Sequence, residues 1–88
     1  MSKVISIDLE MNQPSGKIIQ LGYVIGDPVS GRVFESQSIY VNPKEPIHPD
    51  ITALTGITDV NVSAAVSLEQ AYKVMTWDIQ KHNCSTTP

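Results

Sequence analysis

Three segments of β-strand character, joined by short turns, constrain the fold of this chain most strongly. Residues 3–10, 17–25 and 33–41 are rich in the β-branched and aromatic side chains that favour strands. The connections between them contain Pro, Ser and Gly, which form turns. Because connections this short join neighbouring antiparallel strands, the sequence predicts a three-stranded antiparallel meander.

A short helix and one longer helix are expected after the strands. Pro49 can occupy the first turn of a short helix over 50–54, which Gly56 would end. After an irregular stretch, Ser67 and Gln70 have the spacing of a capping box and would begin the longer helix. One face of that helix is apolar, so the pattern predicts an α+β fold in which this helix packs on the sheet. The apolar face consists of Leu68, Ala71, Tyr72, Met75 and Ile79.

Charge and cysteine content limit the possible ligands of the chain and its expected cellular location. Its 88 residues make one domain or part of one. The net charge of -3, with scattered basic residues, argues against tight binding of nucleic acid through its phosphates alone. The single cysteine, Cys84, cannot form an internal disulfide, which favours a cytoplasmic location. No apolar run approaches the roughly 20 residues of a membrane span, so no membrane association is expected.

Asp8 and Glu10 are the clearest candidates for a functional site. They end the first predicted strand, and side chains two residues apart point to the same face of a strand. Adjacent carboxylates repel each other unless a cation lies between them, so the pair indicates a divalent metal site. The alternative is that both are solvated residues at a strand end. Two carboxylates completed only by water would bind Mg²⁺ weakly.

The remaining acidic residues and both histidines are expected to have structural roles. Glu35 is predicted on the solvent face of its strand, and Asp78 on the exposed side of the long helix. Asp50 suits the N-terminus of the short helix, where the helix dipole favours a carboxylate. His48 is expected in a loop, and His82 would complement the dipole at the end of the long helix.

Three stretches occur in the order and spacing of a known family. Residues 7–10 read Ile-Asp-Leu-Glu, residues 17–22 read Lys-Ile-Ile-Gln-Leu-Gly, and residues 51–58 read Ile-Thr-Ala-Leu-Thr-Gly-Ile-Thr. With these motifs the chain resembles the DnaQ-like (DEDD) family of 3'–5' exonucleases, which have a ribonuclease H-like fold. The resemblance spans nearly all of the chain. It implies that the predicted elements form the N-terminal half of this exonuclease fold.

The resemblance also implies a reaction and a cofactor. The family hydrolyses phosphodiester bonds from the 3' end of single-stranded nucleic acid with two Mg²⁺ or Mn²⁺ ions. Asp8 would bind both ions and Glu10 one of them, so both residues are candidate catalytic and metal-binding residues. The sequence does not distinguish a DNA substrate from an RNA substrate, because no residue indicates a contact to a 2'-hydroxyl.

Four further residues are candidate substrate-binding residues by the same resemblance. The backbone near Met11 and Asn12 would lie along the terminal nucleotide. Leu54 and Thr55 would pack against the last base, which is a contact of shape that reads no sequence.

The chain departs from the family pattern in two respects. Many relatives have Thr where this chain has Met11. The later acidic motifs are not found either. In one alignment Thr86 and Thr87 stand where the second motif has its Asp, and in the other that motif would lie beyond Pro88. The sequence is therefore expected to be a truncated form that carries only the first acidic motif. It would consist of a partial exonuclease-like domain over 1–83 and a polar tail over 84–88.

Two alternatives follow from this incomplete motif set. The first predicted strand would have an open edge, and such edges invite pairing with another chain. The chain could be a non-catalytic binding module, an inhibitor or adaptor that binds a protein partner through that edge. Self-association through the same edge could instead bring two Asp-x-Glu pairs together.

Overall fold

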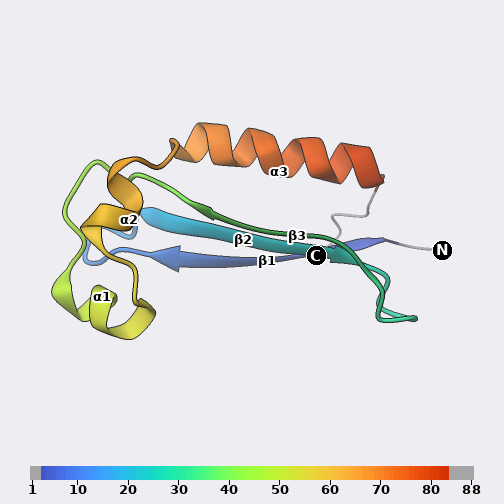
Figure 1. Ribbon diagram of the computed structural model, residues 1–88, viewed down its shortest axis with the longest axis horizontal. Helices are drawn as coiled ribbons and strands as arrows, with labels where there is room; N and C mark the ends of the chain where they lie inside the picture. Colours follow the sequence, from blue (N-terminus) through green and yellow to red (C-terminus); the bar gives the residue numbers. More distant parts are fainter. Residues whose placement is uncertain (1–2, 84–88) are drawn as a thin grey trace.

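The computed structural model describes residues 3–83, in which helix α3 lies along one face of a three-stranded sheet (Figure 1). The strands pair antiparallel in the order β1-β2-β3, which confirms the predicted meander and the α+β class. Helices α1 and α2 lie at the end of the sheet where β1 ends (Figure 1). The elements are β1 (Val4–Met11), β2 (Ile18–Gly26), β3 (Val33–Tyr40), α1 (Pro49–Thr55), α2 (Asp59–Ser63) and α3 (Leu68–His82).

The predicted tail over 84–88, with Cys84, Thr86 and Thr87, lies outside the described residues. The division into a domain over 1–83 and a tail therefore stays a prediction. Within residues 3–83, no helix is long and apolar enough to cross a membrane.

Helix α3 begins as the sequence predicts. The side chain of Ser67 accepts a hydrogen bond from the Gln70 backbone N–H, and the Gln70 side-chain oxygen accepts one from the Ser67 backbone N–H. This capping box satisfies two N–H groups that the first helical turn would otherwise leave without partners. At the other end, Asn83 adopts the left-handed conformation that often ends a helix.

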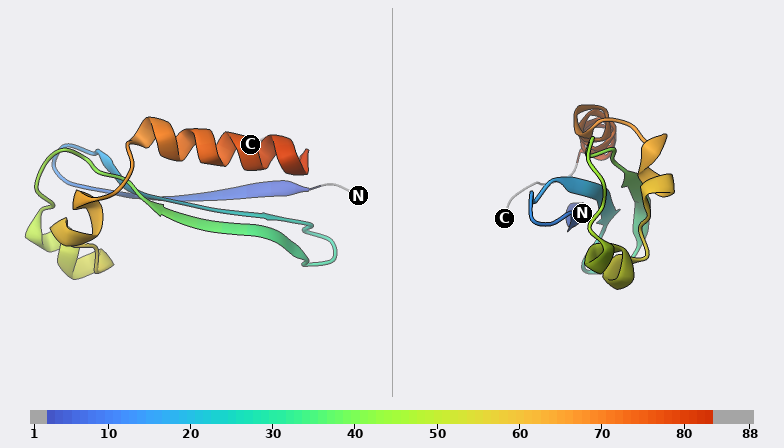
Figure 2. Two further views of the ribbon diagram at one scale, coloured as in Figure 1. Left: turned by 45° about the horizontal axis from the view of Figure 1, so that its top comes forward. Right: turned by 90° about the vertical axis from the view of Figure 1, so that its left-hand side faces the viewer.

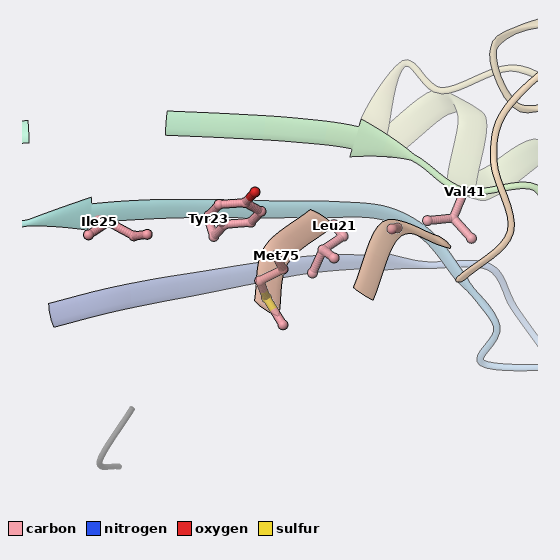
Figure 3. Close-up of a cluster of buried hydrophobic side chains, with 6 residues drawn as sticks. Leu21, Tyr23, Ile25, Val41 and Met75 are labelled. Atoms are coloured by element: carbon pink, nitrogen blue, oxygen red, sulfur yellow. The ribbon is translucent and has the colours of Figure 1, made fainter. Parts of the chain in front are cut away.

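Two hydrophobic clusters hold these elements together. The first, here called the helix cluster, joins α3 to the sheet. Figure 3 shows its residues along β2, with Met75 from α3 beside them. The second, here called the end cluster, joins α2 and the loops on either side of α1 to the beginning of β2, and Ile51 of α1 packs against it. The helix cluster consists of Leu21, Tyr23, Ile25, Val41, Ala71 and Met75. The end cluster consists of Ile19, Ile47, Ile57 and Val62.

The strand register assigns each face of the sheet. Leu9 pairs directly with Leu21, and Asp8 pairs directly with Gly22. Directly paired residues of antiparallel strands point to the same face, and neighbouring residues point to opposite faces. Since Leu21 is buried under α3, Leu9 also faces the α3 side. Asp8 and Glu10 therefore face away from α3.

Helix α2 was not predicted. It replaces part of the stretch expected to be irregular, and Thr58 and Asn61 form its capping box. A five-residue helix is too short to show helical periodicity. Its capping box has Asn where the common pattern has Glu or Gln, so the usual signal was missing.

The prediction for the apolar face of α3 was only partly right. Ala71 and Met75 are buried as expected, and Ile79 packs against the helix cluster. Leu68 and Tyr72 are exposed, because α3 lies mainly over β2 and β3.

The predicted exposure of Asp78 is wrong, because this side chain is only 6% exposed. It lies on the face of α3 that packs on the sheet, where the Tyr23 hydroxyl donates a hydrogen bond to its carboxylate. Burial, together with the hydrogen bond to Asp78, raises the pKa of Tyr23 above its ordinary value. The hydrogen-bonded pair of Tyr23 and Asp78 is thus buried in the interface between α3 and the sheet.

The predicted solvent exposure of Glu35 is also wrong. Glu35 pairs with Ile25 in the sheet and therefore faces α3. Its carboxylate lies 3.1 Å from His82 Nε2 and 3.8 Å from Lys81 Nζ. Lys81 and His82 end α3, so these contacts attach the end of the helix to β3.

We expect the fold to lose stability above about pH 10, because folding raises the pKa of Tyr23. In the unfolded chain this hydroxyl ionises near pH 10, whereas in the folded protein it keeps its proton. The unfolded state then binds fewer protons, so the free energy of unfolding falls by up to about 1.4 kcal/mol per pH unit. Urea unfolding at several alkaline pH values measures this slope. The slope should decrease in Tyr23→Phe and persist in Tyr72→Phe, whose ring is exposed. Equal slopes in all three proteins would contradict the prediction.

Candidate metal and nucleotide site

Asp8 and Glu10 lie next to each other on the face of β1 that points away from α3. The Asp8 side chain is exposed, and Glu10 is half-buried. The strand pairing shifts between Glu10 and Met11, which marks an irregularity directly after the second carboxylate. Such irregularities re-aim side chains at strand ends. The shared face of the two carboxylates is as the sequence predicts.

Gly22 leaves space beside the Asp8 carboxylate. It pairs directly with Asp8 on β1 and with Ser38 on β3, so a side chain here would project from the same face. A Cβ built on Gly22 would lie 3.5 Å from the Asp8 carbonyl oxygen and 3.8 Å from that of Gln37, both ordinary contact distances. The backbone therefore tolerates a side chain at this position, and the open space belongs to the carboxylate face.

A Gly22→Leu substitution should weaken Mn²⁺ binding about tenfold, because the new side chain would cover the Asp8 carboxylate. The affinity can be measured by titrating the protein into Mn²⁺ and following the signal of the free ion by electron paramagnetic resonance. Gly22→Ala is the matched control, since its single methyl group meets no close contact. If Gly22→Leu binds Mn²⁺ as tightly as Gly22→Ala does, the ion does not bind beside Gly22.

Leu54 and Thr55 end the short helix α1, and their side chains have different environments. The Leu54 side chain is 81% exposed, whereas the Thr55 hydroxyl donates to the Ile51 carbonyl at 2.8 Å. The same hydroxyl accepts a hydrogen bond from the Ile57 backbone. The hydroxyl of Thr55 thus stabilises the end of the helix, and Leu54 is left as a protruding apolar side chain.

Helix α1 and the two carboxylates lie on the same side of the sheet. Figures 1 and 2 show α3 on one side of the strands and α1 on the other. Asp8 and Glu10 also point away from α3, as the register shows. The structure therefore places the carboxylates and α1, the helix that carries the exposed Leu54, on one side of the sheet.

Met11 is the last residue of β1 and Asn12 follows it, and the two have opposite environments. Met11 is exposed, whereas Asn12 is only 1% exposed. The Asn12 side chain is hydrogen-bonded to Glu45, Pro46 and His48. Any contact of Asn12 with a nucleotide would therefore involve its backbone. The resemblance to the DEDD family implies the same kind of contact.

The chemistry of Asp8 and Glu10 fits part of a site for Mg²⁺ or Mn²⁺. Carboxylate oxygens are the ligands these ions prefer, and an exposed pair on one face can approach the same ion. In the part of the chain that the structure describes, no group of three or more His, Cys, Asp or Glu side chains could hold a metal ion. The two residues thus supply part of a ligand set, and their role in metal binding stays a prediction.

A model of the RNase T exonuclease family matches residues 5–84. This chain belongs to that exonuclease family. The match includes all of the candidate site residues and confirms the resemblance to DEDD exonucleases. No curated protein sequence is significantly similar to this exonuclease-family chain.

Solved structures of exonucleases share the fold. A full-length 3'-exonuclease matches with a TM-score of 0.82 at 20% identity, over 98% of this chain and 31% of its own. The nuclease domain of 3'hExo, a DEDDh family member bound to rAMP, gives 0.82 at 20% identity, over 98% and 48%. Exonuclease X, in complex with 5' overhanging duplex DNA, gives 0.66 at 22% identity, over 100% and 56%. These similarities show the fold, and this exonuclease-family chain spans about a third to a half of each solved protein.

One feature of the site was missed by sequence reasoning. The side chain of Asn12, itself a candidate residue, is hydrogen-bonded to Glu45 across 33 residues of sequence. Neither residue type is a signal for such a contact, since Asn and Glu are common in loops. The family motifs mark the residues that would touch metal or nucleotide, and they do not mark those that hold these residues in place.

Proposed function

We propose that this chain acts in metal-dependent 3'–5' exonuclease chemistry, the hydrolysis of phosphodiester bonds at nucleic-acid 3' ends. It would supply the first acidic motif and part of the nucleotide pocket. The observation that carries the proposal is the arrangement at the end of β1. There Asp8 and Glu10 point to the side of the sheet on which α1, with its exposed Leu54, lies.

Asp8 and Glu10 would hold Mg²⁺ or Mn²⁺ through their carboxylate oxygens. When bound, these ions polarise the phosphodiester, activate water and stabilise the leaving oxygen. Asp8 is the more accessible ligand, and Gly22 leaves the space that a phosphate would need beside it. Glu10 is half-buried, so its position is more strongly fixed by the strand.

Leu54 would hold the terminal nucleotide through its base. An exposed apolar side chain can pack against the face of any base, so this contact binds a 3' end without reading its sequence. The backbone at Met11 and Asn12 would lie along the same nucleotide. The single-stranded 3' end would thus lie across the end of β1, between the carboxylates and α1.

Hydrolysis would need carboxylates in addition to Asp8 and Glu10, because two carboxylates and water make a weak Mg²⁺ site. We propose that a second chain supplies the rest, because residues 1–2 and 84–88 contain no carboxylate side chain. The net charge of -3 supports a strict dependence on metal, since the chain itself offers little attraction for phosphate.

A nuclease assay on 5'-labelled single-stranded RNA and DNA tests the proposal. We expect stepwise loss of mononucleotides from the 3' end with Mg²⁺ or Mn²⁺, and none in the presence of a chelator. Glu10→Gln should abolish the reaction, whereas Glu69→Gln, an exposed carboxylate in the first turn of α3, should leave it unchanged. Equal activity in both variants would contradict the proposal. Products that begin at internal positions would show an endonuclease instead.

A second candidate function is a binding module that acts through the free edge of β1. Within the described sheet, β1 pairs with β2 on one side and with no strand on the other. Ile7 and Leu9 on this strand are 48% and 39% exposed, because α3 covers mainly β2 and β3. An unpaired strand with exposed apolar side chains favours pairing with another chain, either a protein partner or a second copy.

Sedimentation over a range of protein concentrations tests the self-associating form of this candidate. We expect a dimer that dissociates in Ile7→Lys, since a lysine would place a charge in the paired surface. Val29→Lys is the control, because Val29 is exposed in the turn between β2 and β3. A wild-type protein that remains monomeric would exclude self-association and leave only a protein partner. The cytoplasmic location predicted from the sequence stays part of either proposal.

A further inference from the structure

Asn12 connects the end of the carboxylate strand to the segment that leads into α1. It follows Glu10 by two residues and is almost fully buried, although it lies in a loop. Burial of a carboxamide is unfavourable unless its hydrogen-bonding groups have partners. The partners of this side chain therefore show what it holds together.

The carboxamide of Asn12 has a partner for every kind of hydrogen-bonding group it carries. Nδ2 donates to Glu45 Oε2 at 2.6 Å and to the Pro46 carbonyl at 2.9 Å. Oδ1 accepts from the His48 backbone N–H at 2.9 Å. One side chain therefore binds three residues of the segment before α1.

The Asn12 backbone is fixed as well. Its N–H donates to the Lys17 carbonyl at 2.7 Å, and its carbonyl accepts from the Gly16 N–H at 2.9 Å. These bonds close the loop between β1 and β2. Asn12 is therefore rigidly attached to the sheet, and its side chain transmits that position to residues 45–48.

Glu45 is held in its ionised form at this contact. Hydrogen bonds from Ser15 and from Asn12 hold the pKa of Glu45 below its usual range. The Lys17 ammonium lies 3.6 Å from the other carboxylate oxygen. An ionised acceptor strengthens the hydrogen bond from Asn12, which is consistent with its short length.

His48 is the point at which α1 begins. Its carbonyl accepts from the Ile51 and Thr52 backbones at 2.9 and 3.1 Å, and its Nδ1 accepts from the Asp50 N–H at 3.1 Å. Because Asn12 holds the His48 N–H, it fixes the start of α1 relative to the end of β1. Leu54 lies at the other end of this short helix.

We propose that Asn12 is a positioning residue, whose buried carboxamide sets the placement of Leu54 relative to the Asp8 and Glu10 carboxylates. This inference rests on the proposed function, because it concerns the binding of a 3'-terminal nucleotide between these two groups. It assigns to the side chain a role in which it touches neither metal nor nucleotide. Loss of the side chain should therefore weaken nucleotide binding and leave metal binding intact.

The hydrogen bond to Glu45 explains why position 12 requires Asn rather than Asp. Asp has the same shape but no N–H donor, and it would place a second carboxylate against Glu45. Changing Glu45 to Gln at the same time removes that repulsion and returns a donor, now from Gln to Asp. The pair Asn12→Asp and Glu45→Gln is thus a reciprocal exchange that should restore the contact to Glu45. The Pro46 carbonyl would still lack its donor, so the restoration would be incomplete.

Three measurements on the 88-residue chain test the inference. Amide hydrogen exchange at Thr52 and Gly56 reports how firmly α1 is held. Electron paramagnetic resonance gives the Mn²⁺ affinity. Fluorescence anisotropy gives the affinity for a labelled single-stranded oligonucleotide with phosphorothioates at its 3' end, which slow hydrolysis. Circular dichroism establishes that each variant is folded.

In Asn12→Asp we expect about tenfold faster exchange in α1 and about tenfold weaker oligonucleotide binding, with an Mn²⁺ affinity within about twofold of wild type. Adding Glu45→Gln should recover most of both losses. Asn42→Ala is the matched control. Its side chain makes two hydrogen bonds, to Ser63 and Lys44, where that of Asn12 makes three, but it does not join β1 to α1.

Each failure has a distinct signature. Unchanged exchange in α1 would overturn the inference, because Asn12 would not be holding the helix. A parallel loss of Mn²⁺ affinity would also overturn it, since Asn12 would then act through Glu10. If the wild-type chain binds no oligonucleotide, the proposed function fails, and the exchange rates still decide whether Asn12 positions α1.

Discussion

Replacing Asp8 by Asn is expected to lower the affinity for Mn²⁺ at least about hundredfold, the largest effect on ligand binding from any single change in this chain. Asp8 is the exposed member of the carboxylate pair, and its neighbour Gly22 leaves it accessible. An amide oxygen carries no charge, so the remaining ligand, Glu10, would hold the ion alone. Titration followed by electron paramagnetic resonance measures the loss directly.

The matched control for this experiment is Asp50→Asn. Asp50 is also a well-exposed carboxylate, but it lies in the first turn of α1 rather than on the face of β1. Its replacement should leave the Mn²⁺ affinity unchanged. If the Asp50 and Asp8 variants lose affinity equally, Mn²⁺ binds the acidic surface in general, and the assignment of a site to β1 fails.

Tyr23→Phe should cause the largest loss of stability in this set of predictions, about 3 kcal/mol in the free energy of unfolding. The substitution removes one oxygen and leaves the ring in place, but that oxygen is the hydrogen-bond donor to the buried Asp78 carboxylate. A buried charge without its partner is far less stable than the same charge in water. Urea unfolding, followed by circular dichroism at neutral pH, measures the change.

The control for this prediction is the double substitution Tyr23→Phe with Asp78→Leu. With both polar groups gone, an apolar pair occupies the interface between β2 and α3, and most of the lost stability should return. If the double variant is no more stable than Tyr23→Phe alone, the loss comes from packing. In that case the hydrogen bond to Asp78 contributes little to the fold.

The parts of the fold that could be predicted are those with local signals. Runs of β-branched and aromatic residues between turn-forming residues predicted the strands, and the spacing of Ser67 and Gln70 predicted the start of α3. The burial of Asp78 could not be predicted in this way, because its partner Tyr23 is 55 residues away in the sequence. Taken alone, an acidic residue on a surface helix is expected to be exposed, and only the assembled interface reverses this.

The same distinction applies to the site. The common face of Asp8 and Glu10 follows from the two-residue period of a strand, so the sequence alone predicts it. The buried Asn12 is different, because its role depends on Glu45 and His48 meeting it in the folded chain. Residues that contact a ligand are marked by motifs, whereas residues that position them are visible only in three dimensions.

The separation of the hydrophobic residues into two clusters has a consequence for cooperativity. The helix cluster holds α3 on the sheet, whereas the end cluster holds α1 and α2. Opening of the end cluster would release α1, and with it Leu54, while α3 stayed packed on the sheet. We therefore expect the protein to lose ligand binding at a lower temperature than the one at which α3 unfolds. A ligand held by β1 and α1 together would link the two transitions, since it binds only when both parts are folded. Binding would then make this small protein unfold as a single cooperative unit.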